Sequence, residues 1–154
     1  MITKENIEIF QSIFKGRKDV YPERFISRKT GKIGYSPACK NKFNNELCNF
    51  KCRDCANADY RQLSSKTIDL HLSGKIIGIY PLLPDNKSWF AAVDFDGKKV
   101  DPLKETKAFL AVCEVQGLSA YLERSQSGNG YHVWIFFISP ISARKIRIVI
   151  KALL

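Results

Sequence analysis

The chain has 154 residues, 45% of them hydrophobic, which is enough for one packed domain or a small core with an appended module. No apolar run approaches the roughly 20 residues of a membrane span, and acidic residues occupy the place of a signal peptide's apolar stretch, so we expect a cytoplasmic protein without a membrane partner. The formal net charge of +10 favours a polyanionic partner, commonly nucleic acid, although a merely soluble basic protein could carry the same charge.

The N-terminal part is predicted to be irregular after one short helix. Apolar side chains recur at helical spacing over residues 5–14. From residue 15 to about 65, basic residues alternate with Gly, Pro, Asn and Cys, and neither helical nor strand periodicity is evident. A loop-rich stretch of this length is improbable in a compact domain unless something staples it. We therefore divide the chain into residues 1–65, a helix plus a Cys-rich element, and residues 66–154.

The remainder of the chain shows patterns of regular secondary structure. We expect helices over residues 102–116, which Gly117 ends, and from Ser139 onward, where Pro140 suits the first helical position. Strands are expected over residues 76–83, 89–96, 119–124 and 131–138. The order β-β-α-β-β-α predicts an α+β fold, with an antiparallel or mixed sheet and helices packed on one side.

Four of the five cysteines fall within 17 residues, in the stretch that needs a staple, with the spacing C-x8-C-x3-C-x2-C. Cys52 and Cys55 can reach one tetrahedral ion from a tight turn, and the basic neighbours Lys51 and Arg53 favour their thiolate form. Without a secretion signal, metal is favoured over disulfides. Cys113 lies on an apolar helix face and is expected in the core. The cluster predicts a structural Zn²⁺ site, with a redox pair or ordinary buried thiols as alternatives, at Cys39, Cys48, Cys52 and Cys55.

Two carboxylates end the predicted strand WFAAVDFD. Asp94 and Asp96 are two residues apart, so their side chains point to the same face of the strand. Paired carboxylates repel each other unless a cation lies between them, and this arrangement suits Mg²⁺ or Mn²⁺. On its own the pair is a weak signal, because many such pairs are solvated strand ends.

A glycine-rich turn leads directly into the last predicted strand. Its amides and the hydroxyls of Ser125 and Ser127 could cradle phosphate oxygens, with Gly128 supplying the backbone freedom. His132, the second residue of that strand, could reach the same anion. The alternative is a hairpin-like turn with an exposed histidine. Together, the acidic pair and this turn predict a nucleotide and metal site.

These motifs resemble the archaeo-eukaryotic primases, which carry an acidic D-x-D on one strand and a small-x-His motif on another. Here the matching segments are Asp94-Phe-Asp96 and Gly130-Tyr-His132. The closer resemblance is to the primase domain of TOTE conflict systems and to CRISPR-associated primase-polymerases. It covers nearly the whole chain and is most specific in the segment ERSQSGNGYHVWIFF of residues 123–137.

The resemblance implies an RRM-like palm that transfers nucleotides on a template. Asp94 and Asp96 would hold two Mg²⁺ or Mn²⁺ ions, one activating the attacking 3′-hydroxyl and one the pyrophosphate leaving group. The incoming nucleoside triphosphate would be bound by Arg124, Ser125, Ser127, Gly128 and His132. The zinc element would contact a single-stranded DNA or RNA template through the basic residues Arg17, Arg24, Arg28, Lys40 and Lys42, and binding would depend strongly on salt.

Two departures from the family pattern bear on activity. Gln126 stands where the family commonly has arginine, and the third acidic residue of these primases, on a later strand, would fall beyond Leu154. Glu123 is acidic and adjacent, but nothing in the sequence assigns it that role. The palm is therefore expected to be partial, with further domains of a longer polypeptide or operon partners completing it.

Three other functions compete with the primase interpretation. The first is a catalytically incomplete module that binds single-stranded nucleic acid or nucleotide. The second is a metal-dependent nuclease built on D-x-D, which the glycine-rich turn with its histidine suits less well. The third, nicotinamide binding, is disfavoured because the turn leads into a strand, whereas the dinucleotide fingerprint leads into a helix.

Overall fold

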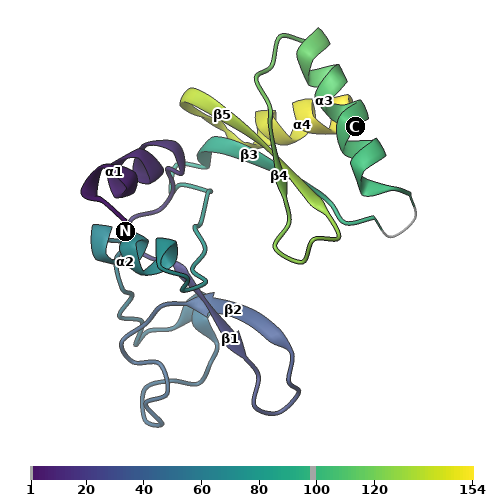
Figure 1. Ribbon diagram of the computed structural model, residues 1–154. Coiled ribbons are helices and arrows are strands. Elements are labelled where there is room, and N and C mark those ends of the chain that lie inside the picture. The colour runs from purple at the N-terminus through teal and green to yellow at the C-terminus, as the bar shows by residue number, and fades with distance from the viewer. Residues whose placement is uncertain (1, 98–99) are drawn as a thin grey trace. The chain divides into compact units, whose positions relative to one another are not determined.

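The computed structural model describes residues 2–97 and 100–154, which form two compact units that divide between Leu83 and Pro84 (Figure 1). Each unit has its own antiparallel sheet and two α-helices within the described residues, which makes the chain α+β as predicted. None of the helices in these residues has the length and apolar character needed to cross a bilayer.

The first unit packs two helices and a hairpin around a small core. Helix α1 (Lys4–Ile13) begins at a capping box formed by Thr3 and Asn6, and α2 (Ser65–Leu72) begins at a second one formed by Ser64 and Thr67. Strands β1 (Pro22–Ile26) and β2 (Ile33–Pro37) pair antiparallel, and a single 3₁₀ turn, η1, spans Cys52–Asp54. The small core consists of Tyr21, Ala38 and Ile77, with Leu63 packed against it.

The predicted strand over residues 76–83 does not form. Ile77 makes one isolated bridge with Glu23, Gly78 donates its N–H to Pro22, and the carbonyl of Tyr80 accepts from Arg17. The apolar run is thus used to pack Ile77 into the small core, with its backbone bonded to two different segments. For this reason the first unit extends to Leu83, past the expected boundary at residue 65.

The second unit is a three-stranded sheet with both helices on one face. It contains β3 (Lys87–Phe95), α3 (Pro102–Val115), β4 (Tyr121–Arg124), β5 (Tyr131–Ser142) and α4 (Ala143–Leu153). The strand order is β3-β5-β4, with antiparallel neighbours, so the long strand β5 is central. The core under the helices is formed by Ala91, Val93, Phe95, Phe109, Cys113, Val133 and Ile135. Cys113 is fully buried there, which confirms its prediction as a core residue.

The last helix begins later than predicted. Strand β5 continues through Pro140 to Ser142, which pairs with Lys87, and α4 starts only at Ala143. Pro140 falls where the ladder between β3 and β5 shifts register, a position at which its missing N–H costs no strand pairing.

Candidate active site on the open face of the second sheet

A cross-strand row of charged side chains forms the centre of the candidate site. Asp94 on β3 and Glu123 on β4 are both register partners of His132 on the central strand β5. His132 Nε2 lies 3.7 Å from Asp94 Oδ1, and His132 Nδ1 lies 3.3 Å from Glu123 Oε2. The structure therefore brings the predicted residues Asp94 and His132 together and adds Glu123 to them.

Strand alternation explains why these side chains share one face. Val93 and Phe95 on β3 and Val133 on β5 point into the core under the helices. Their neighbours in sequence must point to the opposite, open face. The Asp94 side chain is 69% exposed there, and Asp96, exposed as well, directly follows the end of β3. The acidic pair thus lies at the end of a strand whose other face is anchored by apolar packing.

Glu123 is the functional candidate that sequence reasoning left without a role. Its Oε2 accepts a 2.6 Å hydrogen bond from Trp134 Nε1 in addition to facing His132. Trp134 is two residues beyond His132 on β5 and therefore shares its face. The contact between Glu123 and His132 follows from the alternation of side chains along β4 and β5 together with the register between these two strands. That register could not be read from the sequence of the turn.

The glycine-rich turn between β4 and β5 is closed largely by its own oxygens. The amide of Gly128 donates to the Ser125 carbonyl, that of Asn129 to Ser127 Oγ, and that of Gly130 to Ser125 Oγ. The amides of Gln126 and Ser127 donate to no protein acceptor in the described part of the chain. An anion at this turn would therefore meet two free amides, fewer than an open glycine-rich loop offers.

Two further contacts fix the shape of the turn. The Arg124 guanidinium donates to the Gly128 carbonyl from Nε at 3.2 Å and from a terminal nitrogen at 3.1 Å, so Arg124, the last residue of β4, braces the turn. Gly128 has a φ of 77°, a conformation that glycine adopts without strain. Gly130 is packed so closely on the end of β3 that a Cβ would lie 2.7 Å from the Phe95 carbonyl oxygen. These glycines place the turn directly beside the strand end that carries Asp96.

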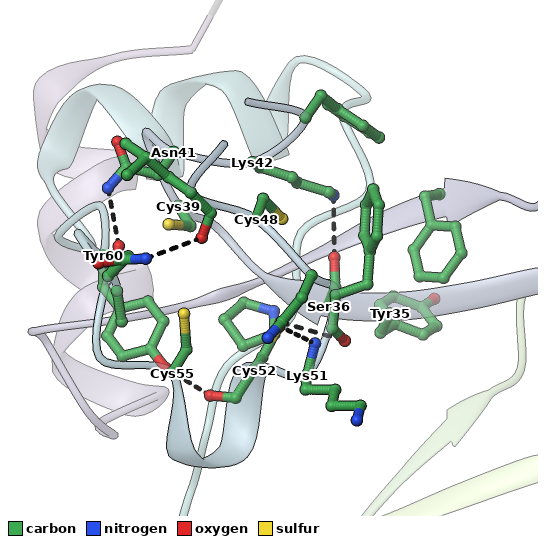
Figure 2. Close-up of a pocket in the computed structure, with 18 of the residues that line it drawn as sticks. Tyr35, Ser36, Cys39, Asn41, Lys42, Cys48, Lys51, Cys52, Cys55 and Tyr60 are labelled. Carbon is green, nitrogen blue, oxygen red and sulfur yellow. Dashed lines mark hydrogen bonds between the residues drawn. The ribbon is translucent and has the colours of Figure 1, made fainter. Parts of the chain in front are cut away.

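The four clustered cysteines line one pocket of the first unit and are all free thiols (Figure 2). The pKa of the nearby Tyr60 is raised, first by burial and then by the Cys52, Cys55 and Cys39 side chains, so each of these three lies near Tyr60. Within the described residues, however, no three Cys, His, Asp or Glu side chains converge closely enough to hold a metal ion. Four thiols in one pocket fit zinc in their chemistry and number, but a bound ion would have to draw them together.

The predicted template-binding cations differ in how they are engaged. Arg17 forms an ion pair with Asp19, and Lys40 forms a 3.0 Å ion pair with Asp59, so a carboxylate offsets each charge. Arg24 and Arg28 are exposed on and beside β1. Lys42 donates to Ser36 Oγ at 2.9 Å. Of the five predicted cations, Arg24, Arg28 and Lys42 form no ion pair with a carboxylate among the described residues.

The candidate site thus lies on an antiparallel sheet that has helices on one face and an acidic, histidine-containing row on the other. A family model described as the archaeo-eukaryotic primase domain of TOTE conflict systems matches residues 5–154. The chain therefore belongs to this family, which confirms the resemblance seen in its motifs. No curated protein matches it.

Proposed function

We propose that this chain is the catalytic part of a primase-type nucleotidyltransferase that joins nucleoside triphosphates on a single-stranded template. The observation that supports this most directly is the row Asp94–His132–Glu123, with Asp96 at the end of the same strand, in a member of the primase family. Family membership supports nucleotidyltransferase activity in general, and the template-directed reaction is our extension of it.

The metal-binding role falls to Asp94 and Asp96. Both are exposed carboxylates on one face at the end of β3, which fits the oxygen donors that Mg²⁺ and Mn²⁺ prefer. Bound there, the ions would supply charge neutralisation for the triphosphate and activation of the attacking hydroxyl. The residues themselves keep two negative charges in place on a sheet that apolar packing holds rigid.

The triphosphate-binding role falls to His132 and the turn. With a proton on both ring nitrogens, His132 donates from Nδ1 to Glu123 and presents its Nε2–H beside Asp94, where a phosphate oxygen would accept it. Ser127 Oγ and the amides of Gln126 and Ser127 offer further donors to phosphate oxygens. Arg124 contributes by bracing Gly128, which holds Ser125 and Ser127 in position.

One observation favours a second candidate function, a catalytically incomplete module that binds single-stranded nucleic acid. Glu123, the carboxylate on the other side of His132 from Asp94, is already engaged by Trp134 and His132. Two metal ions would need a further carboxylate to complete their coordination. Among the described residues, no group of three or more possible metal ligands supplies one. Binding without transfer would then be the property of this chain on its own.

Manganese-dependent nucleotide incorporation on primed and unprimed single-stranded templates separates the two functions. We expect incorporation by the chain, or by a version extended past Leu154 where the gene continues, and its loss by at least about 100-fold in Asp94→Asn. Glu114→Gln is the matched control, because this exposed carboxylate lies on α3, which packs on the opposite face of the sheet. Template binding without incorporation by any version would overturn the enzyme and leave the binding module.

A further inference from the structure

A wide pocket in the first unit gathers most of the exposed aromatic side chains. It has a volume of about 890 Å³ and lies between the β1-β2 hairpin and the loop that carries the cysteines (Figure 2). That volume is in the range of small-molecule sites and far exceeds what a single ion needs. Five large aromatic side chains are exposed in the described residues, and the four that line this pocket are Phe25, Tyr35, Phe43 and Phe50.

Two of these aromatic residues have an unusual backbone conformation. Phe43 and Phe50 have φ values of 70° and 60°, in the left-handed region that bulky residues rarely adopt. They remain 69% and 64% exposed, and their ring centroids lie 5.9 Å apart. Neither core burial nor backbone preference accounts for phenylalanine at these positions. Residues in sparsely populated backbone conformations cluster at active sites and ligand-binding sites.

The pocket is lined by several cations and by no carboxylate. Among its lining residues there is no Asp or Glu, whereas four of them are cationic: Arg28, Lys29, Lys42 and Lys51. Lys42 Nζ lies 5.4 Å from the Phe25 ring centroid and 5.3 Å from that of Phe43. None of the four cations forms an ion pair with a carboxylate in the part of the chain that the structure describes, unlike Lys40 outside the pocket.

We propose that this pocket binds an unpaired base of a single-stranded nucleic acid, with Phe43 and Phe50 stacking on the base and Lys42 neutralising an adjacent phosphate. Exposed rings interleaved with unpaired cations match a strand that alternates flat bases with phosphates. An acidic peptide could satisfy the charges, but it offers fewer flat faces to the rings. The inference rests on the proposed function, for which it supplies the surface that holds the template.

Phe43→Gly and Phe50→Gly test the stacking with little disturbance of the fold. Glycine adopts positive φ without strain, so each substitution removes the ring and keeps the backbone path. Asn86→Gly is the matched control, since Asn86 also has a positive φ, of 60°, but lies in the second unit. The measurement is fluorescence anisotropy with a short oligothymidylate and with an abasic strand of equal length. Each phenylalanine variant should bind oligothymidylate about 5- to 100-fold more weakly than the unaltered chain does, while abasic binding stays the same.

Salt dependence separates the rings from the cations. Lys42→Gln should flatten the slope of log affinity against log salt by about 0.7, because one phosphate contact is lost, while the ring variants keep the original slope. Lys32→Gln, on the hairpin but outside the pocket, should leave the slope closer to that of the unaltered chain. Ring variants that bind both strands as the unaltered chain does, or that weaken both equally, would overturn the proposal. Capture of an acidic peptide in place of the strand would also overturn it.

The outcomes distinguish this inference from the proposed function. Asp94-dependent incorporation combined with unchanged strand binding in the ring variants would remove the base pocket alone. Base-dependent loss of binding in the ring variants of a chain that incorporates no nucleotide would support the pocket and remove the nucleotidyltransferase. Both measurements use the whole chain, so a folding defect in one unit is detected by the unfolding curve of the same sample.

Discussion

His132 is held from two sides on the open face of the second sheet, and this double contact defines its chemistry. Glu123 faces one ring nitrogen and Asp94 the other, and Trp134 secures Glu123 through its indole N–H. A histidine on a flat sheet face would otherwise rotate among rotamers, and substrate binding would have to fix its orientation. In the proposed function, the row would therefore preorganise the ring before a nucleotide arrives.

Glu123→Gln tests this positioning role. Glutamine keeps an acceptor for Trp134 but removes the carboxylate that faces His132, so the ring loses its strongest orienting contact. We expect the KM for the nucleoside triphosphate to rise about 5- to 10-fold, the effect of one hydrogen bond of about 1 kcal/mol, with kcat little changed. Steady-state kinetics against nucleotide concentration measure this split.

A different result would assign Glu123 another role. A fall in kcat of about 100-fold or more, with a changed dependence on manganese concentration, would indicate that Glu123 is a metal ligand and not a positioning residue. Trp134→Phe serves as the companion variant, because it releases Glu123 while leaving its charge in place. It should reproduce the KM effect more weakly.

At the scale of single residues, the sequence predicts Asp94, Asp96 and His132 as site residues but leaves Glu123, which contacts His132, without a role. The alternation of side chains along the strand WFAAVDFD places Asp94 and Asp96 on one face. The motif Gly130–His132 places the histidine at the start of the strand predicted over residues 131–138. Glu123 could not be assigned, because its partner depends on the register across a six-residue turn. That register is set by the packing of the sheet on its helices and by the hydrogen bond from Arg124, at the end of β4, to the turn, and neither leaves a local pattern.

The turn between β4 and β5 is the element on which the proposed nucleotide site depends. Its internal hydrogen bonds close it without help from the substrate, and its close contact with the end of β3 fixes it relative to Asp96. The two central demands on its sequence are a positive φ at Gly128 and the absence of a Cβ at Gly130. Both are backbone requirements, so they can be tested without changing any charged group.

Gly130→Ala should damage the site by steric contact alone. A Cβ there would lie 2.7 Å from the Phe95 carbonyl oxygen and 3.4 Å from the Asp96 Cα, so the strand end must move. We expect the free energy of unfolding to fall by about 1–3 kcal/mol and incorporation to fall further than stability explains. Chemical denaturation and incorporation assays on the same preparation measure both effects.

Gly117→Ala is the control for this prediction. Gly117 has a φ of 68°, a Cβ at this position would meet nothing within 4 Å, and the residue ends α3 away from the turn. Alanine there should cost about 1 kcal/mol of stability through its backbone conformation and leave the KM for nucleotide unchanged. Equal losses of incorporation in both variants would show that the turn does not position the site.

Other elements show where pattern reading stops. Helices α1 and α3 were confirmed to within two residues, because caps and apolar spacing mark them locally. The β1-β2 hairpin was missed, since its apolar side chains, Phe25, Ile26, Ile33 and Tyr35, are exposed and no buried face imposes alternation. The run at residues 76–83 looked like a strand but lacks a partner along its length, which only the tertiary fold reveals.

The whole molecule consists of two units whose chemistry differs. The second unit carries the acidic row on a sheet with a buried core, whereas the first has only a small core and a long loop-rich stretch. A core cluster of three buried apolar residues is small for a unit of this length, and such units commonly need a metal or a disulfide. The described cysteines form no disulfide, and we propose that a bound metal ion is the staple of this unit.

Two cysteine substitutions, one in each unit, test that staple. Metal analysis should find one zinc ion per chain, and Cys52→Ser should lose it, because a hydroxyl is a poor zinc ligand. Cys52→Ser, or a chelator, should lower the midpoint of the first unit's thermal transition and leave that of the second unit in place.

Cys113→Ser should do the reverse, since burial raises the pKa of the Cys113 thiol and keeps it neutral in the second unit's core. Its buried hydroxyl should cost about 1–3 kcal/mol without changing the zinc content. A chain that contains no zinc, and whose first transition is indifferent to Cys52→Ser, would show that these four thiols are ordinary side chains and that the small core suffices.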